Sequence, residues 1–175
     1  MLAACWAAWF FPFVFRARRV RRRQAAATDR RGVWGQPLEA LALGVAALGP
    51  GVEPGPARIA AAMLLAPVGP ILAWWAVEHL GRQWRMHAGL WPDHRLITTG
   101  PYGLVRHPIY TSILAVALAA GLLRASWPAI LLSVALFVAG TEIRVRVEDR
   151  LLASRFGKEF EAYRRSTRAY LPFVR

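Results

Sequence analysis

The residues best suited to chemistry lie in the segment TTGPYGLVRHPIY, which runs from Thr98 to Tyr110 between apolar stretches. Pro108 predicts the start of a helix, because the N–H that proline lacks would have no partner in a first turn. His107 would then lie at the helix N-terminus, where free N–H groups and the helix dipole favour an anionic group. An alternative is a plain interfacial cap, in which Arg106 snorkels toward lipid headgroups.

A second cluster lies in EIRVRVEDRLLASRFG, where Arg144 and Glu148 share one helical face at a spacing of i, i+4. The simplest interpretation of this spacing is a surface ion pair worth about 0.5 kcal/mol. The pair follows the apolar run Ala125–Thr141, whose partner run begins at His107. We therefore expect the two clusters to meet at one membrane–cytosol boundary.

Five runs with few or no charges are predicted to position these residues. Their lengths approach the roughly 20 residues that span a hydrocarbon core of ~30 Å. The second run is the weakest because it carries Glu39. The predicted fold class is all-α: a polytopic membrane protein with about five transmembrane helices and a C-terminal amphipathic helical segment. The runs are Met1–Phe15, Val33–Val52, Ile59–Val77, His107–Leu123 and Ala125–Thr141.

Prolines, glycines and short connections refine this topology. Pro67 and Pro70 are expected to kink the third helix, since each removes a backbone donor. The linker LLRASWP is so short that the last two helices must form an antiparallel hairpin. Gly157 is expected to end the amphipathic helix that follows. The last residues, YLPFVR, turn apolar again and are expected to fold back onto the protein or the membrane.

The distribution of charge favours a membrane over a nucleic-acid partner. The chain has 175 residues, 56% of them hydrophobic, and a net charge of +13. With the N-terminus outside, the inner segments 16–32, 78–106 and 142–175 hold 21 of the 23 Lys and Arg residues, as the positive-inside rule predicts. The basic excess then faces anionic headgroups. No nucleic-acid partner is predicted, and the scattered histidines and lone Cys5 predict no metal site.

Three consecutive parts of the chain together resemble the isoprenylcysteine carboxyl methyltransferase family of integral-membrane enzymes. They are the segment HRLITTGPYGLVRHPIY, a helical hairpin and the segment RVRVEDRLLASRFGKEFEAYRRSTRAYLPF. Membrane phospholipid methyltransferases are similar more loosely. The resemblance covers Leu80 to Phe173. It implies a division into residues 1–79, about three N-terminal membrane helices with a basic inner loop, and residues 80–175, a catalytic region with a cofactor-binding loop, a transmembrane hairpin and C-terminal helices.

The resemblance also implies S-adenosyl-L-methionine as the cofactor and assigns residues to it. Arg144 would lie beside the methyl-accepting group and bind substrate, with Glu148 and Arg106 completing the catalytic set. His87 falls where many relatives carry an amide, and Asp149 replaces the commoner second Glu. The cofactor-binding residues implied are His87, His94, Arg95, Leu96, Ile97, Tyr102, His107, Pro108, Ile109, Tyr110 and Glu148.

The predicted function is methyl transfer to a lipophilic acceptor, most simply the carboxylate of a prenylcysteine-like or other lipidic molecule. A carboxylate is already ionised at neutral pH and needs no base, whereas an amine would need His107 or Glu148 as a proton sink. The alternatives are a phospholipid or amine N-methyltransferase, a dinucleotide-dependent sterol-type reductase and a non-enzymatic membrane scaffold. The Arg-rich composition suggests a bacterial protein, and hence an inner membrane. The charge distribution places the N-terminus outside and the C-terminus in the cytoplasm.

Overall fold

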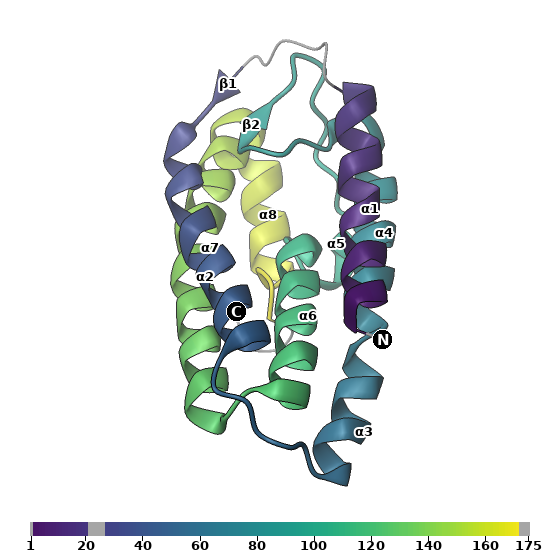
Figure 1. The fold of residues 1–175 in the computed structure, drawn as a ribbon. Coiled ribbons are helices and arrows are strands. Elements are labelled where there is room, and N and C mark those ends of the chain that lie inside the picture. Colours follow the sequence, from purple (N-terminus) through teal and green to yellow (C-terminus); the bar gives the residue numbers. More distant parts are fainter. Residues whose placement is uncertain (1, 21–26, 172–175) are drawn as a thin grey trace.

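The computed structural model describes residues 2–20 and 27–171, and the fold is nearly all-α (Figure 1). A short antiparallel pair, β1 (Ala27–Thr28) with β2 (Gly89–Leu90), lies at one end of the bundle. The helices are α1 (Leu2–Val20), α2 (Gln36–Leu48), α3 (Pro56–Leu65), α4 (Val68–Leu80), α5 (Pro101–Leu104), α6 (Pro108–Arg124), α7 (Trp127–Phe156) and α8 (Lys158–Ser166), with 3-10 turns η1 (Arg30–Gly35) and η2 (Gly81–Gln83).

Two helical stretches in the described part of the chain are long and apolar enough to cross a membrane. They are Pro56–Gln83, with 28 residues, and Trp127–Phe156, with 30. Ala4–Ala17 and Pro108–Arg124 are apolar but shorter. The all-α class is therefore confirmed with two candidate membrane helices, while a total of five spans stays a prediction.

The predicted interruption of the third run is present at Pro67, whereas Pro70 lies inside α4 and does not end the helix. The third apolar run is broken between α3 and α4, at Ala66 and Pro67. α6 and α7 form the predicted hairpin, because only Ala125 and Ser126 separate them. Gly157 ends α7 with a φ of 51°, a conformation that favours glycine.

α2 packs along α7, and the two backbones touch where Gly35 meets Gly140. A Cβ atom on Gly35 would lie 2.3 Å from the Gly140 carbonyl oxygen, and one on Gly140 would lie 2.6 Å from that of Gly35. Side chains of any size would therefore force the helices apart. This close approach fixes the register of α2 against the part of α7 that carries Arg144.

The C-terminal segment clamps the turn that precedes α6. The Arg106 and His107 N–H groups donate to the carbonyls of Arg168 and Ala169, both at 2.7 Å. The Thr111 hydroxyl donates to the Tyr170 carbonyl at 2.6 Å. The predicted return of the chain end is thus present at residues 168–170, and residues 172–175 lie outside the described part.

Candidate active site

A cavity of about 440 Å³ is lined in part by β2, at Gly89 and Leu90. This volume is in the range of small-molecule sites. α1, α6 and α7 supply an apolar wall, while the loop from Gln83 to Ile97 supplies much of the polar one. The apolar wall includes Trp9, Phe10, Phe13, Ile113, Leu151 and Leu152, and the polar side chains include Gln36, Arg85, His87, His94, Arg95, Arg106, Arg144 and Glu148.

The structure brings nearly all the predicted site residues to this one cavity. Pro108 is the exception: it is fully buried at the start of α6 and does not line the space. The individual roles of these residues in binding and catalysis stay predictions. The predicted residues that line the cavity are His87, His94, Arg95, Leu96, Ile97, Tyr102, Arg106, His107, Ile109, Tyr110, Arg144 and Glu148.

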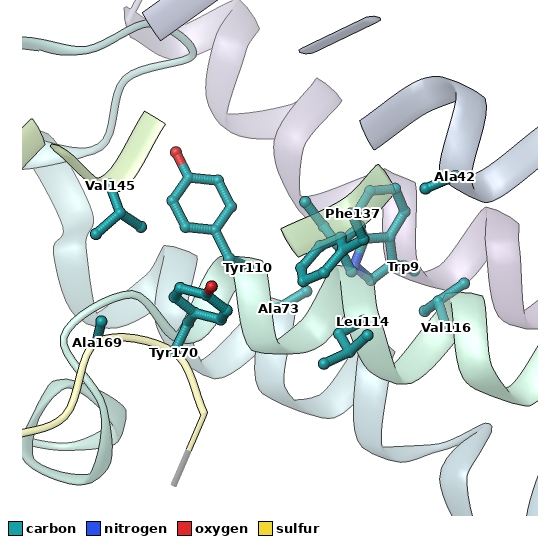
Figure 2. Packing of buried hydrophobic residues seen from close by; sticks show 11 residues of the cluster. Trp9, Ala42, Ala73, Tyr110, Leu114, Val116, Phe137, Val145, Ala169 and Tyr170 are labelled. Carbon is teal, nitrogen blue, oxygen red and sulfur yellow. The ribbon is translucent and has the colours of Figure 1, made fainter. Parts of the chain in front are cut away.

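Tyr110 and Glu148 meet directly, because the Tyr110 hydroxyl donates to Glu148 Oε1. The Tyr110 ring packs in the apolar cluster beside Tyr170, and its hydroxyl points away from Leu114 and Val116 (Figure 2). This hydrogen bond joins the first turn of α6 directly to α7 at Glu148.

His107 lies between two carboxylates at the start of α6. Its Nδ1 is 3.1 Å from Glu148 Oε2, and its Nε2 is 2.9 Å from Asp149 Oδ1. Burial by itself would lower the pKa of His107, but the hydrogen bonds and charges of Asp149 and Glu148 outweigh it and raise the pKa to about 9. Both ring nitrogens therefore carry hydrogen at neutral pH, and His107 is a cation that joins the two acids.

Arg106 is tied to the surrounding fold. Its Nη2 lies 2.9 Å from Asp149 Oδ2, and its Nη1 donates to the carbonyls of Thr167 and, at 3.3 Å, Arg164. These acceptors belong to α7 and to the end of α8 and the segment after it. The arginine thus connects the site turn to the C-terminal segment.

Arg144 has a different partner from the one that its spacing suggested. Its Nη1 lies 2.6 Å from Glu39 Oε2, and no ion pair with Glu148 forms among the described residues. The Thr141 hydroxyl donates to Glu39 Oε1 at 3.2 Å. The guanidinium also lies 4.9 Å from the centre of the Tyr110 ring, within cation–π range. The interpretation as an Arg144–Glu148 surface pair is therefore wrong, since both side chains lie in the cavity wall.

The loop before α5 supplies the remaining polar groups. His94 accepts the Trp91 N–H at Nδ1 over 3.4 Å. Burial, followed by the charge of Arg85, lowers the pKa of His94 to about 4, so its ring is neutral. The Arg85 guanidinium stacks 4.5 Å over the Trp91 ring. The exposed His87 has its Nδ1 3.5 Å from Gln36 Nε2.

Sequence reasoning missed several groups at this site. Glu39 interrupts the second apolar run, and an ionisable residue inside such a run is itself a functional signal. Asp149 was noted as a substitution, yet it holds both His107 and Arg106. No local signal marks Trp9 and Phe13, because only the tertiary fold brings α1 to the cavity.

Comparison with known proteins connects this site to a family. Residues 61–154 match the isoprenylcysteine carboxyl methyltransferase family over more than half of the chain. The chain belongs to this family. The predicted resemblance is thereby confirmed, and family membership together with the two apolar helices makes it a membrane protein. The matched residues include α4, α6 and most of α7, whereas Glu39 lies before them.

Two curated proteins resemble this family member over part of their length. The cobalt-zinc-cadmium resistance protein CzcN of Cupriavidus metallidurans is 35% identical over 94 residues, 53% of this chain and 43% of that protein. The protein-S-isoprenylcysteine O-methyltransferase of Schizosaccharomyces pombe is 32% identical over 82 residues, 47% of this chain and 35% of that protein. The similarity thus covers less than half the length of each relative.

Proposed function

We propose that this protein uses S-adenosylmethionine to methylate a lipophilic acceptor at the membrane–cytosol boundary. We further propose that the accepting group is a carboxylate, on a prenylcysteine-like or other lipidic molecule. The observation that supports this most is the single cavity lined by the His107–Tyr110 turn and by Glu148, with Tyr110 hydrogen-bonded to Glu148. Both sequence motifs of the family thereby face one small volume.

The side chains present fit the proposed cofactor. Glu148 offers a carboxylate to a cationic group, and the exposed Arg95 offers a cation to a carboxylate. Leu96 and Ile97 offer apolar surface to an adenine ring, and the ring of Tyr102 offers an aromatic wall. When bound, the cofactor supplies a methyl carbon made electrophilic by the attached sulfonium.

The hydrogen bonds of the site favour an acceptor that needs no deprotonation. His107 donates from both ring nitrogens, so it has no lone pair free for a proton. Glu148 already accepts from Tyr110 and His107. Because a carboxylate is ionised at neutral pH, these residues have only to align it and exclude water. This supports O-methylation over amine N-methylation.

Arg144 is the proposed contact of the acceptor carboxylate, and the aromatic side chains of α1 are the proposed contact of its lipid part. Phe10 lines the cavity and is 56% exposed, so the apolar wall is continuous with the outer surface of the bundle. The proposed topology keeps five spans in a bacterial inner membrane, with the N-terminus outside and this cavity on the cytoplasmic side. Residues 1–79 then supply the surface for the lipid part of the acceptor, and residues 80–175 supply the cofactor-binding residues and Arg144.

Calorimetry in detergent tests the cofactor assignment. S-adenosylmethionine should bind the wild-type protein, and Glu148→Ala should abolish binding while leaving the protein folded. Glu161→Ala is the matched control, because it removes a carboxylate on α8 that pairs with Arg164. Unchanged affinity in Glu148→Ala would contradict the assignment. A rise in melting temperature with a dinucleotide instead would favour a reductase.

Transfer of a labelled methyl group tests the acceptor. The protein in nanodiscs should label N-acetyl-S-farnesylcysteine and leave phosphatidylethanolamine unlabelled. Alkali-labile label would identify a methyl ester. Label in phosphatidylethanolamine alone would contradict the carboxylate acceptor and support N-methylation.

A further inference from the structure

We infer that Glu39, on α2, is a positioning residue that aims the Arg144 guanidinium at the acceptor. This inference rests on the proposed function, because it assigns Arg144 an acceptor to hold. Glu39 lies outside the residues that match the family, and its side chain is only 6% exposed in an otherwise apolar helix. In this proposal Glu39 does not touch the reacting atoms and acts on them only through Arg144.

The backbone holds Glu39 and Arg144 at a fixed separation. The contact between Gly35 and Gly140 lies one helical turn before each of them on α2 and α7. The Glu39 carboxylate is then held at both oxygens, by Arg144 at 2.6 Å and by Thr141 at 3.2 Å. Its position is therefore set by the helix crossing and by two hydrogen bonds.

Stability alone is a weak reason for such a pair. Removing a carboxylate and a guanidinium from water carries a desolvation cost that often equals their attraction, and apolar residues of similar volume can replace buried pairs without loss. A buried ionisable pair in an apolar segment is therefore better explained by function. Here the function available is the orientation of Arg144, which lines the cavity.

The geometry leaves part of the guanidinium for a ligand. Arg144 has several N–H donors in a planar fork, and Glu39 takes a bond from Nη1. Tyr110 supports one face of the group at 4.9 Å. With one end and one face fixed, the remaining donors have a defined direction, which suits bidentate recognition of a carboxylate.

The charges of the pair show that Arg144 would orient the acceptor carboxylate and would not merely attract it by excess positive charge. Glu39 already compensates Arg144, so the pair offers direction and no excess positive charge to an acceptor. Loss of Glu39 should therefore lower kcat more than it weakens acceptor binding. Because Arg144 would then be uncompensated, the acceptor KM should stay constant or fall.

The rate of methyl transfer in nanodiscs tests this inference in three variants: Glu39→Ala, Glu39→Gln and the control Ser133→Ala. Glu39→Ala should lower kcat for N-acetyl-S-farnesylcysteine about 100-fold, the loss typical of a misplaced catalytic group. Glu39→Gln keeps an oxygen that can accept from Arg144, so its loss should be smaller. Ser133→Ala removes another α2–α7 hydrogen bond, the 2.8 Å bond to the Ala42 carbonyl, and should leave kcat unchanged because Ser133 lies away from the cavity.

Two further readouts separate positioning from a structural role. Added sodium formate should restore part of the kcat of Glu39→Ala, while sodium chloride should not, since formate supplies the missing carboxylate. The Kd of S-adenosylmethionine should remain that of the wild type. If the wild type is active and Glu39→Ala has the same kcat as Ser133→Ala, this inference is overturned while the proposed function stands. The same holds if Glu39→Ala loses kcat, acceptor affinity and cofactor affinity in parallel, because that pattern indicates a structural role. A wild type without methyl transfer would overturn the proposed function and this inference together.

Discussion

Two partly buried arginines, Arg106 and Arg144, line the same cavity and differ in how the protein uses them. Arg106 binds Asp149 and the carbonyls of Arg164 and Thr167. Among the residues that the structure describes, Arg144 has one such partner, Glu39. Sequence alone made both of them catalytic candidates. Arg106 uses both Nη1 and Nη2 to hold chain segments together and leaves its buried Nε without a partner, whereas Arg144 is bound, among the described residues, through Nη1 and keeps its other terminal nitrogen for a ligand.

Tyr110 lies where the two arginine networks meet. Its ring carries the Arg144 guanidinium, while its hydroxyl donates to Glu148. Through His107 and Asp149, that carboxylate is connected to Arg106. The Arg106 side thus fixes the turn and the acid, and the Arg144 side faces the proposed acceptor. We therefore expect changes at Arg106 and His107 to affect mainly stability, and changes at Arg144 and Glu39 to affect mainly catalysis.

The largest expected effect is on stability, from Arg106→Ala. Removing one partner of a buried ion pair costs about 3–5 kcal/mol when the other charge is left uncompensated. Asp149 would keep His107 as a partner, so we expect a loss of about 3 kcal/mol, the low end of that range, with two carbonyls also losing their donor. Unfolding in detergent, followed by circular dichroism, measures the loss. Arg164→Ala is the control, because its exposed pair with Glu161 is worth ~1 kcal/mol at most. Equal stability of the two variants would contradict the structural role of Arg106.

The next largest effect is a pH dependence of stability that comes from His107. The folded pKa of His107 is about 9 against 6.5 in its ordinary state, because Asp149 and Glu148 outweigh the effect of burial. A raised pKa stabilises the fold fully below pH 6.5, and the contribution is lost as pH rises through 9. The shift corresponds to about 3 kcal/mol.

The free energy of unfolding of the wild type relative to His107→Gln measures this contribution. The advantage of the wild type should shrink steadily as pH rises from 6.5 through 9. His94 gives an opposite dependence, because its folded pKa of about 4 makes stability fall as pH drops below 6.5. A pH-independent difference between the wild type and His107→Gln would show that the imidazolium is not held between the two acids.

The sequence predicted the fold where local signals are strong. The Pro67 break, the hairpin between α6 and α7 and the stop at Gly157 each depend on residues close in sequence, so they could be recognised without tertiary contacts. The meeting of Tyr110 with Glu148 followed from the hairpin, since its two arms begin and end at the same side. In the described part of the chain, two helical stretches are long and apolar enough to be candidate spans, whereas five were predicted. The difference arises partly because α2 has 13 residues and α6 has 17, each fewer than a full crossing needs.

The partner of Arg144 could not be predicted from spacing. An i, i+4 rule considers one helix, whereas Glu39 approaches from α2 across the Gly35–Gly140 contact. The pairing of Asp149 with His107 and Arg106 likewise depends on how α7 lies against the start of α6. Motifs could identify which residues face the site, but the helix packing decides which of them are already paired.

A third prediction tests the catalytic side of the comparison. Arg144→Lys keeps a positive charge beside Glu39 but removes the planar fork, so it should lower kcat about 100-fold, or ~2.7 kcal/mol in the barrier. Labelled methyl transfer in nanodiscs measures the rate. Arg146→Lys is the control, because Arg146 is exposed on the same helix and pairs with Glu142. A rate equal to that of the control would mean that charge suffices and that the orientation of Arg144 is irrelevant.

The smallest expected effect concerns the oxygen of Glu39 that Arg144 does not bind. Thr141→Val keeps the shape of a fully buried side chain and removes its 3.2 Å hydrogen bond to Glu39. A typical buried hydrogen bond contributes about 1 kcal/mol, so kcat should fall about fivefold if the bond helps to aim Arg144. In a Glu39→Ala background the same substitution should change kcat no further, because its only route to the acceptor passes through Glu39. The double-mutant cycle measures that dependence. Additive effects would mean that Thr141 acts on the site independently of Glu39 and does not help to orient Arg144.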